Sequence, residues 1–316
     1  MVYIGIDLGG TGIKIGVVDE SGAILSQGET PTLAGRPYED IIADMGRCML
    51  DVMARGGFEE KDIASIGVGI PGVADEKTGH VIFCTNLGWS DVPLRTELQK
   101  YLNKPVYIDN DATVAGFAES ICGVSAGCHS SVFMTLGTGV GGGIVINGKP
   151  YSGVHGIGSE IGHMIIKMDG EPCTCGNLGC MEAYCAASAL TRDGRRAMQA
   201  HPESMLAEQT GGDPGKITPK LVTDCAKAGD AAAKAVFDTY IEHLSSACAS
   251  VYNILDPEVL AIGGGLSAAG PFLFDPLQEK VSKKCFYATR GKLVPAVLGN
   301  EAGMVGAALL ARDAKV

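Results

Sequence analysis

The sequence has no excess of basic residues and no basic run. Its 316 residues carry 25 Lys and Arg against 36 Asp and Glu, a formal net charge of −11 at pH 7. A surface that binds nucleic acid has to neutralise backbone phosphates with Lys and Arg. The charge balance therefore argues against nucleic acid as a partner.

The sequence also lacks segments that direct a chain to a membrane. The N-terminal MVYIGIDLGG has neither a basic n-region nor an apolar h-region, so it does not read as a signal peptide. No uninterrupted apolar run reaches the roughly 18 residues that span a bilayer. We therefore expect a cytoplasmic protein with no membrane partner.

The 11 cysteines do not suggest a disulfide framework. Their number is odd, and most stand singly in apolar stretches, as buried thiols do in a reducing compartment. These single cysteines are Cys48, Cys84, Cys122, Cys128, Cys185, Cys225, Cys248 and Cys285. The other three lie close together beside a histidine.

That cluster occupies residues 158–182 and has the pattern His-x9-Cys-x-Cys-x4-Cys. One imidazole and three thiolates complete a tetrahedral structural zinc site and leave no position for catalytic water. The intervening Gly176 and Gly179 allow the tight turns such a site needs. The alternative is a set of core thiols, or a disulfide pair and a spare, which is less typical of clustered Cys with His. The expected ligands are His163, Cys173, Cys175 and Cys180.

Two segments repeat one arrangement, a β-rich run, a turn of Gly and Thr, and a second β-rich run. The first covers residues 2–18 and the second covers residues 132–146. Exposed N–H groups in such turns suit phosphate oxygens, and two of them predict a nucleotide held between two domains. Each turn alone could be only a hairpin. The match to G-x-G-x-x-G at Gly137 fails as a dinucleotide site because a strand follows it.

Apolar periodicity predicts the remaining elements. Asp111 follows a strand end, where ligands collect in α/β sheets, but it could also be the N-cap of the next helix. The turn at residues 263–265 could approach a nucleotide or simply connect a strand to a helix. The expected helices are 38–55, one around Leu94, Leu98 and Leu102, 112–120, 186–201, one from Thr218 and Pro219, and 230–255; the expected strands are 63–70, 106–109 and 259–262, with a polar loop at 202–216.

Several motifs together resemble the ROK family of sugar kinases and repressors, most closely its bacterial glucokinases. The resemblance covers nearly the whole chain, and the SEIGH and CxCGxxGCxE motifs are the most specific. Thr113 and Ser159 differ from the common pattern, where Asn and Gly are frequent. The motifs are DLGGT at 7–11, IPG at 70–72, NLGW at 86–89, DNDA at 109–112, LGTGVGGG at 136–143, SEIGH at 159–163, CTCGNLGCME at 173–182 and IGGGLS at 262–267.

The resemblance implies an actin-like ATPase (ribonuclease H-like) fold, with two α/β domains and a cleft between them. The domains would be 1–111 with a C-terminal helix at about 301–316, and 112–300. The sugar would be bound by Gly72, Asn110, Asp111, Glu160, His163 and Glu182, with Asp111 as general base. The nucleotide would be bound by Asp7, Gly9, Gly10, Thr11, Lys14, Gly137, Thr138, Gly139, Gly263, Gly264 and Gly265.

The implied activity is ATP-dependent transfer of phosphate to the 6-hydroxyl of a hexose, with glucose favoured. ATP, Mg²⁺ and structural Zn²⁺ are the implied cofactors, and a homodimer or homotetramer is the implied assembly. We also expect loss of zinc to loosen the sugar site while leaving the hairpins at 7–12 and 136–143 largely intact.

Three alternatives stay open at this point. A family kinase for N-acetylmannosamine, fructose or allose would carry the same motifs. A repressor would carry a helix-turn-helix before residue 7, and the sequence is expected to lack one. A non-catalytic sugar sensor is the third, and polyphosphate could replace ATP as donor.

Overall fold

The computed structural model of the protein describes residues 1–314, which divide into two compact units. Unit 1 contains residues 1–133, 143–159 and the chain from 296 onward; unit 2 contains residues 134–142 and 160–295. The C-terminal helix thus belongs to the same unit as the N-terminal segment. The domain boundary predicted at residue 111 stays a prediction, and the last two residues of the helix predicted at 301–316 lie outside the described residues.

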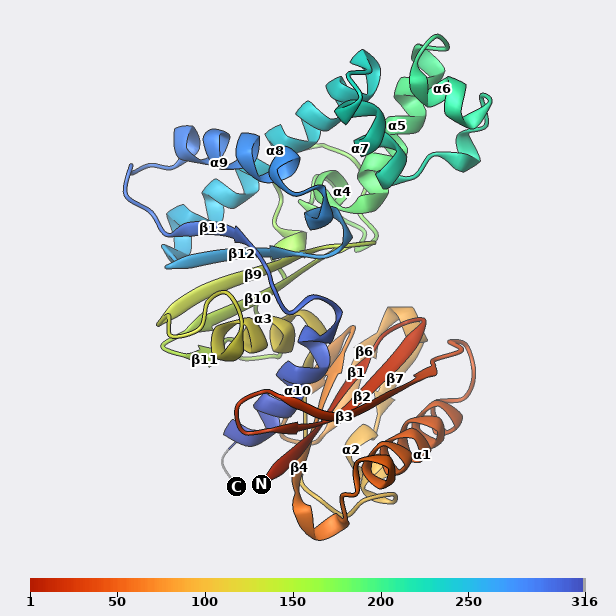
Figure 1. Ribbon diagram of the computed structural model, residues 1–316, viewed down its shortest axis with the longest axis vertical. Coiled ribbons are helices and arrows are strands. Elements are labelled where there is room, and N and C mark those ends of the chain that lie inside the picture. The colour runs from red at the N-terminus through yellow and green to blue at the C-terminus, as the bar shows by residue number, and fades with distance from the viewer. Residues whose placement is uncertain (315–316) are drawn as a thin grey trace. The chain divides into compact units, whose positions relative to one another are not determined.

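Most of the strands belong to unit 1, and most of the helices belong to unit 2 (Figure 1). Unit 1 holds β1 (Val2–Leu8), β2 (Gly12–Asp19), β3 (Ile24–Pro31), α1 (Tyr38–Gly56), β4 (Ile63–Ile70), β5 (Val73–Asp75), β6 (His80–Cys84), β7 (Trp89–Val92), α2 (Leu94–Gln99), β8 (Val106–Asn110), α3 (Asp111–Cys122), β11 (Lys149–Pro150) and α10 (Ala302–Asp313). Unit 2 holds α4 (Glu182–Cys185), α5 (Ala187–Ala200), α6 (Met205–Thr210), α7 (Pro219–Lys227), α8 (Ala231–Leu255), β12 (Val259–Gly263), α9 (Pro271–Lys284) and β13 (Lys292–Pro295). Strands β9 (Ser130–Leu136) and β10 (Val140–Ile146) each have residues in both units.

The first sheet has the strand order β3-β2-β1-β4-β8 and buries both of its faces. Successive side chains of β1 point to opposite faces, as in any strand. Ile4 and Ile6 pack into the large apolar core to which α1 contributes, whereas a Cβ on Gly5 would lie 1.9 Å from the carbonyl oxygen of Met304 in α10. Glycine at position 5 therefore lets α10 lie directly on the sheet (Figure 1).

Two parallel strands of this sheet end side by side at the same edge. Strand β4 pairs in parallel with β8, and Ile70 stands opposite Asn110 in the register. The segment after β4 and the start of α3 therefore leave the sheet at neighbouring points. Parallel strand ends of this kind are where ligands collect in α/β proteins.

The second sheet has the order β11-β10-β9-β12-β13, and a small antiparallel sheet consists of β5, β6 and β7. Strand β12 runs into the predicted turn at residues 263–265. Gly264 has φ +81°, and a Cβ there would lie 2.5 Å from the carbonyl oxygen of Leu136. The turns after β9 and after β12 are therefore neighbours within unit 2.

The predicted helices and strands are confirmed, with small shifts at their ends. The polar loop predicted at 202–216 is wrong, because it contains α6, which Ser204 caps at its N-terminus and Gly211 ends with φ 64°. This helix has six residues, too few for an apolar period to show. All 11 cysteines have free thiols. Within residues 1–314, no helix is long and apolar enough to cross a membrane.

Candidate functional site

The head of α3 holds the predicted general base. Asn110 is the N-cap: its Oδ1 accepts the N–H groups of Ala112 and Thr113 at 2.9 and 3.2 Å. Its amide group donates to the Gly72 carbonyl oxygen at 3.4 Å. Asp111 is the first residue of the helix and is half-buried, with its Oδ1 accepting the Ala112 N–H at 2.7 Å. The alternative that Asp111 is the N-cap is therefore wrong, since Asn110 fills that position.

The first glycine hairpin places Asp7 opposite Lys14 in the β1–β2 register. Burial raises the pKa of Asp7, and Lys14 opposes that rise. The Lys14 ammonium donates to the Asn300 carbonyl oxygen at 2.8 Å and lies 3.6 Å from the Glu301 carboxylate. A Cβ on Gly303 would meet the Asp7 carboxyl group at 2.7 Å, so the start of α10 closes over this pair.

The turn itself is tied to the next strand. The Gly9 N–H donates to the Gly12 carbonyl oxygen at 3.0 Å, so this predicted phosphate donor is used inside the turn. The Thr32 hydroxyl donates to the Gly9 carbonyl oxygen at 2.6 Å, and the Thr32 N–H donates to the Thr11 carbonyl oxygen. Thr11 is exposed and Gly10 is half-exposed. The phosphate-binding role of this turn remains a prediction.

The second glycine hairpin is held by a carboxylate. Oε2 of Glu182 accepts the Val140 N–H at 3.0 Å, and a Cβ on Gly139 would lie 2.4 Å from the same oxygen. The Ser188 hydroxyl and the Ala187 N–H donate to the carbonyl oxygens of Thr138 and Gly137. Sequence reasoning assigned Glu182 to the sugar and gave no sign that it also supports this turn.

The four predicted zinc ligands converge in unit 2. Their ligand atoms all lie within 4.8 Å of one another. Sγ of Cys173 is 3.7 Å from Nδ1 of His163, and Sγ of Cys175 is 3.6 Å from Sγ of Cys180. A tetrahedron with zinc–sulfur bonds of about 2.3 Å has edges of about 3.8 Å. The donor set and its spacing therefore fit zinc.

The backbone and the burial of the cluster support the same conclusion. Gly176 and Gly179 have φ of 91° and 80°, a region that glycine enters without strain. Burial raises the pKa of the Cys180 thiol, and a bound cation would offset this rise by favouring the thiolate.

The predicted sugar-contacting carboxylates lie beside the cluster. Glu160 Oε2 is 4.0 Å from Nε2 of His163, the ring nitrogen remote from Cys173. Burial raises the pKa of Glu160. Oε1 of Glu182 accepts the Thr174 hydroxyl at 3.0 Å and is 3.7 Å from Sγ of Cys173. One side chain thus joins the cluster to the second hairpin.

The structure thus forms four local groups from the predicted residues, two in each unit. Unit 1 brings Gly72, Asn110 and Asp111 together, and it pairs Asp7 with Lys14 beside the first turn. Unit 2 brings Glu160, His163 and Glu182 to the metal cluster, and it sets the turns at 137–139 and 263–265 side by side.

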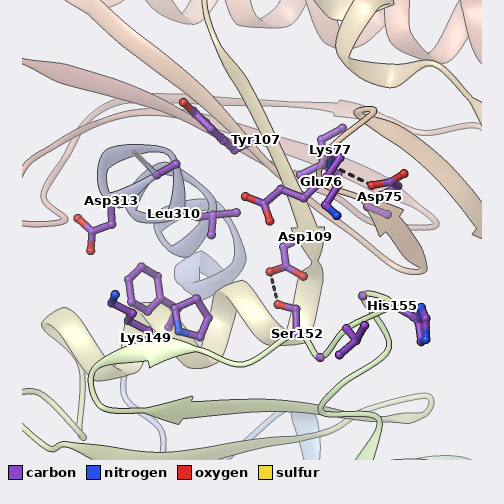
Figure 2. A pocket seen from close by; sticks show the side chains of 18 of the residues that line it. Asp75, Glu76, Lys77, Tyr107, Asp109, Lys149, Ser152, His155, Leu310 and Asp313 are labelled. Carbon is purple, nitrogen blue, oxygen red and sulfur yellow. Dashed lines mark hydrogen bonds between the residues drawn. The ribbon is translucent and has the colours of Figure 1, made fainter. Parts of the chain in front are cut away.

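Unit 1 also contains a cavity of about 1110 Å³ that sequence reasoning missed. It lies beside the strand that leads into the candidate base, and the carboxylate of Asp109 points into its centre (Figure 2). Neither Asn110 nor Asp111 lines it. Ser152 and the residues around it come from a loop whose sequence carried no recognisable motif.

Comparison with known proteins gives matches along the whole chain. The sequence model of the ROK family matches residues 3–314. A glucokinase of Thermotoga maritima is 36% identical over 313 residues, 98% of this chain and 97% of that protein. A xylose repressor of Caldicellulosiruptor bescii is 29% identical over 285 residues, 90% of this chain and 71% of that protein.

Solved structures agree with these matches. A ROK family glucokinase from Streptomyces griseus, in complex with glucose and AMPPNP, has a TM-score of 0.84 at 32% identity and covers 99% of this chain and 100% of its own. A ROK hexokinase from Thermus thermophilus has a TM-score of 0.86 at 32% identity and covers 99% and 98%. The chain therefore has the actin-like ATPase fold that the sequence predicted.

Proposed function

Because this chain belongs to the ROK family, we propose that it is an ATP-dependent sugar kinase that phosphorylates the 6-hydroxyl of a hexose, with glucose preferred. The observation that carries the proposal is the half-buried Asp111 at the head of α3, beside Asn110 and Gly72. The glucokinase relatives and the glucose and AMPPNP complex of the S. griseus enzyme support the choice of sugar and donor.

The proposed chemistry is a proton transfer coupled to phosphoryl transfer. A primary hydroxyl has a pKa far above neutrality, so a positioned carboxylate has to accept its proton as the new bond forms. Asp111 takes that proton while the sugar oxygen bonds to the γ-phosphorus of ATP. The bond from that phosphorus to the bridging β–γ oxygen breaks, ADP leaves with the electron pair, and Asp111 returns its proton to solvent.

Sugar recognition is assigned to fixed polar groups. Asn110 uses its Oδ1 as the helix cap, which orients its amide N–H groups. One of these N–H groups donates to the Gly72 carbonyl oxygen, and we assign the other to a sugar hydroxyl. Glu160, His163 and Glu182 are assigned to the sugar as well. Polar groups held in fixed positions penalise any sugar that leaves them unpaired, so this set also provides discrimination.

Two metals have suitable residues. Magnesium is a hard cation that takes carboxylate oxygens, and bound with the nucleotide it would neutralise phosphate charge; we assign Asp7 to it. Zinc at His163, Cys173, Cys175 and Cys180 would shape the sugar site without taking part in the reaction. With Nδ1 facing the thiols, the Nε2 of His163 is the nitrogen directed to Glu160 and the sugar.

A sugar-responsive regulator is the second candidate, because the C. bescii xylose repressor matches 90% of this chain. The two functions differ in turnover, since a regulator needs sugar binding without ADP release. A kinase for another hexose differs from a glucokinase only in substrate preference. A homodimer or homotetramer is also part of the proposal.

ADP release measured over a panel of hexoses tests all of these together. We expect turnover that is greatest with glucose, and we expect Asp111→Asn to lower kcat by roughly 10² to 10⁴ with a much smaller change in sugar affinity. A variant that kept more than about a tenth of the activity would exclude Asp111 as general base. Sugar binding without any turnover would favour the regulator.

A further inference from the structure

Asp109 is the last β8 residue before Asn110 and Asp111, and both oxygens of its carboxylate are engaged. Oδ1 accepts the N–H of Asn110 at 2.8 Å. Oδ2 accepts the hydroxyl of Ser152 at 2.6 Å, the bond drawn in Figure 2. One side chain thus joins the backbone at the head of α3 to a loop that follows β11.

That loop holds Ser152 in a fixed position. The Gly158 N–H donates to the Ser152 carbonyl oxygen at 2.7 Å, which closes the loop on itself. The Ser159 hydroxyl donates to the Tyr151 carbonyl oxygen at 2.8 Å. Gly156 has φ +70°, and a Cβ there would lie 2.6 Å from the Ala74 carbonyl oxygen. The loop therefore packs tightly against β5, and its serine hydroxyl has little freedom.

These contacts form a closed ring, here called the circuit, that includes Asn110, the residue before the candidate base. From Ala74 the chain leads back to Gly72, whose carbonyl oxygen accepts the Asn110 amide. From Asn110 the circuit continues through the Asp109 carboxylate to Ser152 and through the loop to Ala74 again. Every member belongs to unit 1. The residue before Asp111 is thus held from two sides.

Burying a charged carboxylate at position 109 is unfavourable, and its two hydrogen-bond donors explain why a carboxylate stands there. Burial raises the pKa of Asp109, and the nearby Glu76 raises it further. A neutral amide would be easier to bury. However, the amide nitrogen of Asn accepts no hydrogen bond, so Asn could accept only one of the two donors well.

We propose that Asp109 and Ser152 are positioning residues that hold Asn110 and Asp111 in the orientation that sugar phosphorylation requires. The proposal rests on the proposed function, because it assigns Asp111 the role of general base. Neither residue touches the reacting atoms; each acts through the head of α3. A small displacement of a catalytic group lowers the rate far more than it lowers stability.

The kinetic test compares four variants of the full chain. Asp109→Asn and Ser152→Ala should each lower kcat by about 10- to 100-fold, with the KM for ATP changed less than about twofold. Ser152→Thr keeps the hydroxyl and should restore most of the activity. The control is Ser65→Ala, which removes a buried hydroxyl that donates to the Ala311 carbonyl oxygen at 2.8 Å and touches neither Asp109 nor Ser152. It should lower the Tm without lowering kcat.

Stability separates positioning from a merely structural role. Asp109→Asn should leave the Tm unchanged or higher, because it removes a buried charge, while kcat falls. A loss of kcat that simply follows the loss of Tm across all four variants would overturn the proposal.

Amide hydrogen exchange of ligand-free protein tests, without any turnover, whether Asp109 and Ser152 hold the head of α3. The N–H groups of Ala112 and Thr113, which Asn110 caps, should exchange at least about fivefold faster in Asp109→Asn and Ser152→Ala than in wild type or Ser65→Ala. Unchanged exchange, or faster exchange with unchanged kcat, would refute the proposal. Faster exchange in a protein that phosphorylates no hexose would support the role of Asp109 and Ser152 in holding the head of α3, and it would reject the proposed function.

Discussion

The two glycine-rich hairpins share a chain pattern but are held by different partners. At the first, the cation Lys14 is bound by Asn300 and Glu301, and Thr32 fastens the turn. At the second, the carboxylate of Glu182 accepts the Val140 N–H. The charged group at the first hairpin is thus a cation of its own second strand, whereas the charged group at the second hairpin is a carboxylate that α4 supplies from 42 residues away.

This difference changes what loss of zinc should do. The sequence alone predicted that both hairpins would stay largely intact. Glu182 lies beside Cys173 and also supports the second turn, so that turn depends on the cluster. Among the described residues of unit 1, Glu301 and Thr32 hold the first hairpin, and neither of them is next to a zinc ligand in the sequence.

Loss of a zinc ligand should have the largest effect. We expect Cys175→Ser to release zinc, raise the KM for glucose and lower the Tm by roughly 5 to 10 °C, because a structural metal contributes directly to folding. Hydrogen exchange should accelerate at Val140 and stay unchanged at the N–H of Gly9. Metal analysis, calorimetry and exchange on one preparation provide the measurements.

The matched control for that experiment is Cys225→Ser, which changes a buried cysteine outside the cluster. It should keep its zinc and leave Val140 protected. Equal acceleration at both hairpins in Cys175→Ser would show that the cluster supports the whole chain, and full activity without metal would contradict the account.

Removal of the cation at the first hairpin should come next. Lys14→Met should raise the KM for ATP about tenfold, the value of one charge-assisted hydrogen bond of about 1.4 kcal/mol. The KM for glucose should change little. Lys61→Met, which removes an exposed ion pair with Glu59, is the control. An unchanged KM for ATP would show that Lys14 only supports the start of α10.

Glu182→Gln should lower stability by a smaller amount, through the second hairpin. The amide keeps an acceptor oxygen but loses the charge, which weakens the bond to Val140 by about 1 kcal/mol. The Tm should fall by about 2 to 4 °C. The control is Glu242→Gln, which removes a carboxylate paired with Lys280 and Lys284. It tests whether the loss of any carboxylate charge in unit 2 changes the Tm and the exchange at Val140 in the same way. Exchange at Val140 that rises equally in both variants would show that Glu182 does not specifically hold the second hairpin.

The smallest effect is a pH dependence that belongs to the first hairpin. Burial raises the folded-state pKa of Asp7, so its contribution to stability is fully present below the unfolded value near 3.9 and is lost as pH rises through the folded value. Asp7→Asn should remove this dependence and, at pH 7, be as stable as wild type or more stable by about 1 kcal/mol. Urea unfolding of both proteins between pH 4 and 7 measures the difference. A variant clearly less stable at pH 7 would mean that ionised Asp7 stabilises the fold.

The sequence predicted what depends on neighbours in the chain. The strand pattern around residues 7–14, the capping of α7 by Thr218 and the spacing of Cys173, Cys175 and Cys180 all follow from short-range chemistry. Lys14 meets Asn300 across 286 residues, and Asp109 meets Ser152 across 43. No periodicity encodes such pairs, because the fold alone brings them together.

The central claim is that this chain transfers the γ-phosphoryl group of ATP to a hexose with Asp111 as base. Phosphorus NMR of a reaction with glucose tests it most directly, since it identifies both products. The account predicts one sugar monoester with its phosphate on the 6-oxygen, formed in equal amount with ADP by wild type and nearly absent with Asp111→Asn. ADP and free phosphate without a sugar ester, or equal yields from both proteins, would contradict it.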